Sequence, residues 1–223
     1  MGLIGTIRRG LAGGVWLLAA PAVVISGLVV SVSAAGPLAL TADQQQRLAA
    51  GEIVVLEDRP PGASAGAGGG TAVAVVQAPV ERVWGVLTDY PGHPRYYPGV
   101  VAAEVLEMSG PRVLVRYTVR VGFFSFGFHM SKVADPIRRR IEWELAPDRA
   151  NGLLRENSGY WLVEARPDGS LVTYAMAVRS YLPGFLTTAS ERESLVETVS
   201  GLRRVVASSP RAADPRGRGA VRP

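Results

Sequence analysis

Hydrophobic and polar residues alternate along most of the chain between about residue 100 and residue 181. In residues 112–121, for example, valines and Tyr117 take every second position, and arginines fill most of the positions between them. Such a period of two is typical of strands that have one buried and one solvated face, as in an antiparallel sheet covered on one side. Turn residues such as Pro167-Asp168-Gly169-Ser170 separate the segments. The expected strands cover residues 100–108, 112–121, 126–133, 137–145, 158–166 and 171–181.

The period changes to that of a helix over residues 185–207. Four apolar residues recur there at helical spacing, and they are Leu195, Val199, Leu202 and Val206. This stripe has to be buried, and the apolar face of the sheet is the partner at hand. A shorter helix is expected over residues 80–89 and a further helical turn around Tyr96 and Tyr97. The pattern predicts an α+β fold in which an antiparallel sheet packs against a long C-terminal helix.

The segment before this sheet predicts a helix over Thr41–Ala50, a short strand over Ile53–Leu56 and a loop over Pro60–Gly70. A further strand is expected over Thr71–Gln77. The glycine run at the end of the loop contains no lysine and precedes a strand, whereas a phosphate-binding loop precedes a helix. The run therefore does not predict nucleotide binding.

Both ends of the chain differ in composition from its middle. Arg8-Arg9, an apolar run over residues 11–32 and the small residues Ser33 to Gly36 form the pattern of a secretory signal. The run is also nearly long enough for a membrane anchor, so both interpretations stay open. Either one predicts an exported domain, in the periplasm or at the outer face of the cytoplasmic membrane. The expected organisation is a signal or anchor over 1–35, an N-terminal helix, strand and glycine-rich loop over 36–70, the main domain over 71–207 and a disordered basic tail over 208–223.

Charge and composition narrow the classes of function. The net charge is +5, but six of the 24 basic residues lie in the two terminal segments, and without these segments 18 basic and 18 acidic residues remain. A nearly neutral domain is a poor candidate for nucleic-acid binding. The sequence has no cysteine and two histidines, His93 and His129, which argues against a metal site. We expect no cofactor.

Several short motifs lie where the sheet and its helices begin and end. They are Ala78-Pro79-Val80-Glu81-Arg82-Val83-Trp84, Leu87-Thr88-Asp89-Tyr90, His93-Pro94, Tyr97-Pro98-Gly99-Val100, Gly159-Tyr160-Trp161 and Pro183. With the order of elements, they make residues 71–207 resemble the START-like (SRPBCC) superfamily, which includes the polyketide cyclase/dehydrase and coenzyme Q-binding proteins. The resemblance implies a helix-grip fold, a curved sheet around the long helix with a cavity between them. It also implies binding of an apolar molecule such as a lipid, sterol, quinone or polyketide. Most members bind or carry, and a minority catalyse.

The residues expected to form the cavity walls are the apolar ones on the inner faces of the sheet and the helix. They are Val115, Tyr117, Val119, Ile141, Trp143, Trp161, Tyr174, Met176, Val178, Leu195, Val199 and Leu202. The alternative for each of them is plain core packing. We expect a hydrophobic small molecule or lipid as the partner.

The segment Gly122–Phe128 contains four aromatic residues and two glycines between two strands. It predicts either a buried strand pair or an exposed lid or membrane-contacting tip that carries Phe123, Phe124 and Phe126. Asp89 and His93 are close enough in sequence for an acid–base pair, but a turn cap and a loop histidine are the plainer interpretation. The sequence therefore favours a non-catalytic lipid carrier over a cyclase/dehydrase-type enzyme. A third alternative is a protein–protein adaptor with a filled core.

Overall fold

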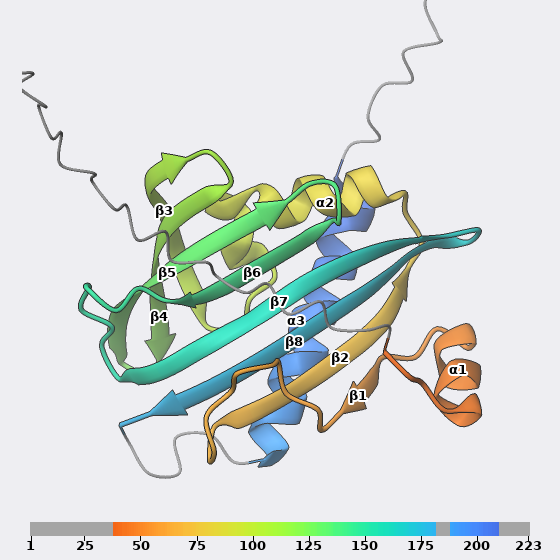
Figure 1. The fold of residues 1–223 in the computed structure, drawn as a ribbon, viewed down its shortest axis with the longest axis horizontal. Coiled ribbons are helices and arrows are strands. Elements are labelled where there is room, and N and C mark those ends of the chain that lie inside the picture. Colours follow the sequence, from red (N-terminus) through yellow and green to blue (C-terminus); the bar gives the residue numbers. More distant parts are fainter. Residues whose placement is uncertain (1–37, 182–187, 210–223) are drawn as a thin grey trace, which may run out of the picture. The chain divides into compact units, whose positions relative to one another are not determined.

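A computed structural model describes residues 38–181 and 188–209, and within them eight strands form one antiparallel sheet (Figure 1). The strands are β1 (Val54–Leu56), β2 (Gly68–Val76), β3 (Val100–Ser109), β4 (Arg112–Val121), β5 (Phe124–Asp135), β6 (Arg140–Leu145), β7 (Leu154–Arg166) and β8 (Gly169–Ser180). Their order in the sheet is β1-β2-β8-β7-β6-β5-β4-β3. Hairpins join the consecutive strands from β3 to β8, so the main crossover is the return from β2 to β3.

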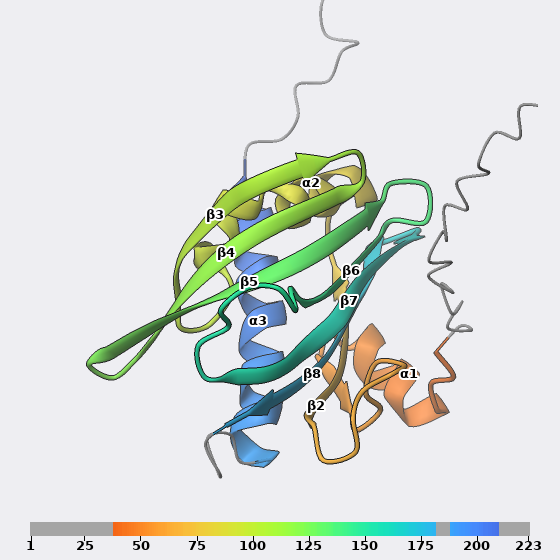
Figure 2. The same cartoon turned by 60° about the vertical axis from the view of Figure 1, so that its left-hand side comes forward.

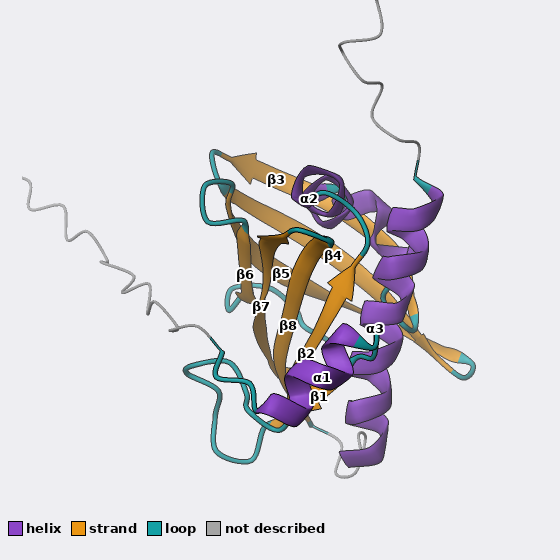
Figure 3. Ribbon diagram, turned by 90° about the vertical axis from the view of Figure 1, so that its right-hand side faces the viewer, coloured by secondary structure: helices purple, strands orange, loops and turns teal. Residues whose placement is uncertain are grey.

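Four helical segments accompany the sheet. They are α1 (Ala42–Ala49), α2 (Val80–Thr88), the 3-10 helix η1 (Tyr90–Arg95) and α3 (Thr188–Ser208). The sheet is curved, and α3 crosses the face toward which it bends (Figure 3). The main contacts of α3 are with β2 at one side of the sheet and with α2 and η1 at the other. This arrangement is the predicted helix-grip fold.

The alternation of β4 confirms which face is inside. Val113, Val115 and Tyr117 are buried, whereas Arg112 and Arg116 are exposed. The inward set stops before Val121, which is 44% exposed. The reason is visible in Figure 2, where the β4–β5 hairpin runs beyond the body of the sheet and leaves its end without cover.

The prediction for the strand over residues 137–145 was wrong at its start. The strand begins at Arg140, and Ile137 is 92% exposed in the preceding turn. The Asp135 carboxylate accepts hydrogen bonds from the backbone N–H groups of Ile137 and Arg138, both at 2.9 Å. Such a side-chain turn competes with strand pairing. Arg139 then adopts a φ of 52° and redirects the chain into β6.

The glycine run was also wrongly predicted as loop. Gly68, Gly69 and Gly70 open β2 and pair with β8. A Cβ atom on Gly69 would lie 2.1 Å from the Met176 carbonyl oxygen, and the φ of Gly69 is 122°. Only glycine allows this close approach of two strands.

The predicted first helix is confirmed. Thr41 and Gln44 form a reciprocal capping box at the start of α1. The predicted signal or anchor, the expected start of the last helix at 185 and residues 210–223 of the predicted tail lie outside the described residues. Ser208, predicted as the first residue of the tail, still belongs to α3. No helix within 38–181 or 188–209 is long and apolar enough to cross a membrane.

Candidate ligand-binding site

A cavity of about 350 Å³ lies between the sheet and α3. It exists because α3 rests mainly on β2 and on η1 and α2, which leaves space over the middle strands. Its lining comes from β4 to β8, from α3, from the segment that follows η1 and from the first residue of β3. The lining residues are Tyr97, Pro98, Gly99, Val100, Tyr117, Val119, Arg120, Val121, Phe126, Phe128, Met130, Lys132, Trp143, Leu154, Asn157, Tyr174, Met176, Ser194 and Thr198.

The twelve predicted wall residues divide into two groups. Five of them line the cavity, namely Tyr117, Val119, Trp143, Tyr174 and Met176. The other seven do not reach it and are buried in the packed core, namely Val115, Ile141, Trp161, Val178, Leu195, Val199 and Leu202. The second group shares the predicted inner face, but α3 or neighbouring side chains cover it.

Stacked aromatic rings form one wall. The Tyr174 ring stacks on Trp161 with a centroid distance of 4.2 Å and on Trp143 with 5.8 Å. Trp161 is held in turn by a 2.7 Å hydrogen bond from its Nε1 to the Tyr97 hydroxyl. Trp143 Nε1 donates to Asn157 Oδ1 at 3.1 Å, and the Tyr174 hydroxyl donates to Met176 Sδ at 3.2 Å. Because these polar atoms have partners, the wall presents ring faces to the cavity.

The inner face of β5 was missing from the predicted cavity walls, although Phe126 on this face was predicted as part of a lid or membrane contact. Phe126, Phe128, Met130 and Lys132 follow one another at every second position, and all four line the cavity. The signal for this face is the same alternation that identified β4. In β5 it is less regular because a lysine stands at an inward position.

Lys132 is the most unusual residue of the site. It is the only lysine in a chain that has 24 basic residues other than histidine, and only 2% of it is exposed. Its Nζ lies 4.7 Å from the Trp143 ring centre and 5.5 Å from that of Tyr117. No hydrogen bond or ion pair joins it to another residue of the described chain. Burial lowers the pKa of Lys132 to about 7, because an ammonium ion is poorly solvated here.

His93 is not the loop residue that the sequence suggested. It is buried in η1, where its ring nitrogens contact the Tyr117 hydroxyl at 2.7 Å and the Leu87 carbonyl oxygen at 3.0 Å. The carbonyl can only accept, so Nε2 carries the proton and Tyr117 donates to Nδ1. Burial and the charge of Lys132 lower the pKa of His93 well below its ordinary value, which keeps the ring neutral. Asp89 forms an ion pair with Arg95 at the surface and is not paired with His93.

The segment Tyr97–Val100 separates the cavity from a surface groove of about 720 Å³. Arg120 lines both spaces, and Arg95 and Arg204 line the groove only. This segment and Arg120 therefore mark the outer end of the cavity. The nearby β4–β5 hairpin tip presents Phe123 and Phe124, which are 102% and 79% exposed, whereas Phe126 is half-buried and lines the cavity.

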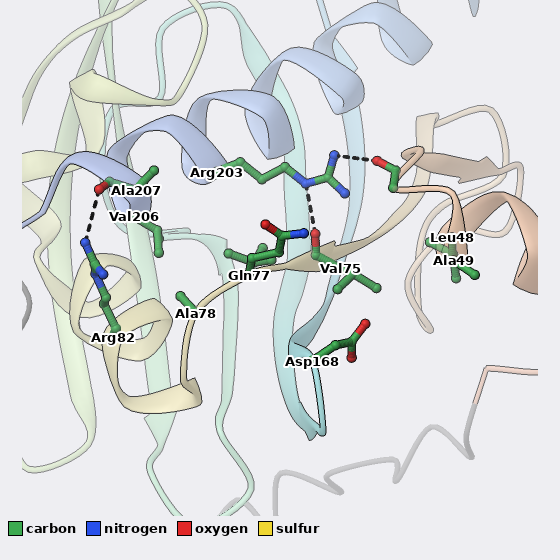
Figure 4. Close-up of a pocket in the computed structure, with 12 residues that line it drawn as sticks. Leu48, Ala49, Val75, Gln77, Ala78, Arg82, Asp168, Arg203, Val206 and Ala207 are labelled. Atoms are coloured by element: carbon green, nitrogen blue, oxygen red, sulfur yellow. Dashed lines mark hydrogen bonds between the residues drawn. The ribbon is translucent and has the colours of Figure 1, made fainter.

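A second pocket of about 370 Å³ lies between α1, β2 and the C-terminal half of α3 (Figure 4). Arg203 donates to the carbonyl oxygens of Val75 and Gly51, and Arg82 donates to those of Ala207 and Ser209. Both guanidinium groups thus fasten neighbouring segments to α3. The pocket has a more polar lining than the cavity over the sheet, which makes the latter the better candidate for an apolar ligand.

The curved sheet, the long helix and the apolar cavity define a helix-grip protein with an internal ligand site. The family described as polyketide cyclase/dehydrase and lipid transport matches residues 70–207. The chain belongs to this family and to the START-like superfamily. No curated protein matches the sequence.

Solved structures of the superfamily share the fold. A STAR-related lipid transfer protein fragment from Xanthomonas axonopodis has a TM-score of 0.57 and 18% identity, over 70% of this chain and 98% of that one. The Zhui aromatase/cyclase of a Streptomyces species has a TM-score of 0.51 and 21% identity, over 61% and 92% of the two chains. A START superfamily protein from Mycobacterium smegmatis has a TM-score of 0.52 and 17% identity, over 61% and 95%. Proteins named for lipid transfer and proteins named as cyclases therefore share this fold.

Proposed function

We propose that this protein binds and carries one apolar, lipid-type molecule in the cavity between the sheet and α3. The observation that supports the proposal is the cavity itself. Aromatic and aliphatic side chains line it, and it occupies a volume that side chains would fill in a solid core. Its volume of about 350 Å³ falls at the lower end of the range of small-molecule sites, about 300–1,000 Å³. A hollow core also argues against the adaptor alternative, which needs no such space.

The expected ligands are an isoprenoid quinone, a phospholipid or a similar lipid. The N-terminal sequence pattern supports a place of action outside the cytoplasm, in the periplasm or at the outer face of the cytoplasmic membrane. Phe123 and Phe124 support a transient contact with a bilayer, since exposed aromatic rings favour its interface. The tip and the outer end of the cavity are formed by the same hairpin, so such a contact would bring the cavity close to its lipid source.

Mass spectrometry of organic extracts from the purified full-length protein tests the proposal. A single class of lipid recovered in amounts near one per chain is the expected result. Protein that yields no extractable lipid and also leaves fluorescent lipids unbound would contradict it.

One observation favours the second candidate, a cyclase/dehydrase-type enzyme. Lys132 has a pKa of about 7 and could accept a proton from a substrate in the cavity. Against this role, no proton relay from Nζ to a described residue exists. Comparison of the molecules extracted from the wild type and from Lys132→Met separates the two candidates. A carrier gives the same molecule from both, in a smaller amount from the variant if Lys132 contacts the ligand, whereas an enzyme gives a different molecule, the unreacted substrate, from the variant.

A further inference from the structure

We propose that the ligand of the cavity carries a single carboxylate, which binds the ammonium group of Lys132 at the inner end of the cavity. This inference rests on the proposed function and narrows its ligands from quinones, phospholipids and similar lipids to a lipid that carries a free carboxylate. The argument has three steps, which concern charge, position and stoichiometry.

The charge of Lys132 has no counterpart in the cavity. The lining contains no aspartate or glutamate, and its other basic residue is Arg120. The rings of Trp143 and Tyr117 offer their faces to Nζ, but ring faces compensate a buried cation only in part. Burial of an unpaired charge costs free energy, and binding of an anion next to Nζ would offset this cost. The site therefore favours a ligand with a negative charge.

Position places this anion deep in the cavity. Phe126, Phe128, Met130 and Lys132 line it in sequence order along β5, and Phe126 lies near the hairpin tip. Six residues at about 3.3 Å each put Lys132 roughly 20 Å further in along the strand. A ligand with its acid group at Lys132 would therefore lay its hydrocarbon along Met130 and the two phenylalanines toward Arg120.

Stoichiometry favours a carboxylate over a phosphate monoester. One ammonium ion balances one negative charge, whereas a phosphate monoester carries about −1.5 to −2 at pH 7. The other titratable groups that face this part of the cavity cannot supply the difference. Burial raises the pKa of Tyr97, Tyr117 and Tyr174 and lowers that of His93, so all four are neutral at pH 7.

Competition binding with a matched pair of probes tests the inference. Hexadecanoic acid and hexadecan-1-ol are titrated against Nile red at pH 6.5 on the full-length wild type, on Lys132→Met and on the control Arg116→Gln, which removes an exposed cation outside the cavity. We expect the wild type and Arg116→Gln to bind the acid at least tenfold more tightly than the alcohol. Lys132→Met should bind both equally, with its affinity for the alcohol unchanged and its folding checked by circular dichroism.

The pH profile adds a readout that a merely structural lysine would not move. Above pH 7 the free amine must take up a proton to bind the acid, so the affinity for the acid should fall about tenfold per pH unit while that for the alcohol stays constant. Lys132→Arg should keep the preference for the acid without this pH dependence. Equal wild-type affinities for acid and alcohol would overturn the inference and leave the proposed function intact. A wild type that binds neither probe nor Nile red would overturn both.

Discussion

The hydroxyl group of Tyr117 donates a 2.7 Å hydrogen bond to Nδ1 of His93, and this bond links the inner wall of the cavity to the helical segment outside it. Tyr117 belongs to β4 and lines the cavity, whereas His93 belongs to η1. The bond requires the neutral ring, because a protonated Nδ1 could not accept it.

The first prediction concerns acid. The pKa of His93 is lowered by burial in the folded state, while an unfolded histidine has a pKa of about 6.5. Below pH 6.5 the unfolded chain takes up a proton that the folded chain does not, so stability should fall by up to about 1.4 kcal/mol per pH unit. Urea unfolding between pH 7 and pH 5 measures this. In His93→Gln the free energy of unfolding should fall less steeply between pH 7 and pH 5, by the contribution of one proton. An unchanged slope would refute the assignment of a neutral, buried His93.

The second prediction concerns Lys132 in the empty protein. Its pKa is about 7 when folded and about 10.4 when unfolded, so the unfolded chain binds more protons between these values. The free energy of unfolding should therefore rise from pH 7 to pH 9.5, by about 1.4 kcal/mol per unit from this group. Lys132→Met should abolish this rise. At pH 7 its free energy of unfolding should exceed that of the wild type by a few kcal/mol, which is about the free-energy equivalent of the lowered pKa. A methionine variant less stable at pH 7 than the delipidated wild type would contradict the description of this lysine as an unpaired buried cation.

The third prediction compares two helical glycines. A Cβ on Gly201 of α3 would lie 2.8 Å from the carbonyl oxygen of Tyr96 and 2.9 Å from the Cα of Tyr96. The helix would therefore have to move away from the segment after η1. We expect Gly201→Ala to cost about 1–3 kcal/mol, as overpacking does. Gly85 of α2 has no atom within 4 Å of such a Cβ, and Gly85→Ala should stabilise by about 0.5–1 kcal/mol. Chemical denaturation of the two variants checks both signs, and effects in the same direction would count against this packing.

The fourth prediction concerns the hairpin tip. The double variant Phe123→Ser/Phe124→Ser should bind liposomes at least several-fold more weakly in a flotation assay, because it removes both exposed rings from the tip. Ile137→Ser is the control, since Ile137 is 92% exposed in a different turn. Equal loss in the control, or no loss in the double variant, would remove the tip as a membrane contact.

The sequence predicted the fold well because the fold depends on patterns that repeat. The alternation of β4 and the helical stripe at Leu195, Val199 and Leu202 each identify a buried face without knowledge of its partner. The misplaced start of β6 has a local cause, the turn made by Asp135, which a pattern of apolar residues does not contain.

The site was less predictable from the sequence. Alternation shows which face of the sheet a residue lies on, but it does not show whether that residue contacts other side chains or the cavity. Val115 and Tyr117 stand two apart on the same face of β4, yet the first is in packed core and the second lines the cavity. The difference is set by which segments and side chains lie over each residue, which is a property of the assembled fold. Lys132 could have been found from its inward position in β5, as the one charged residue on that face.

The central claim, that the space under α3 is a binding site, is tested most directly by filling it. Val119 lines the cavity, whereas Val101 is 42% exposed on β3. Val119→Trp therefore places an indole ring inside the cavity, and the control Val101→Trp places the same ring outside it. Equilibrium titration with Nile red should show tight binding by the wild type and Val101→Trp, and binding at least tenfold weaker by Val119→Trp. Undiminished binding by a correctly folded Val119→Trp variant would contradict the account.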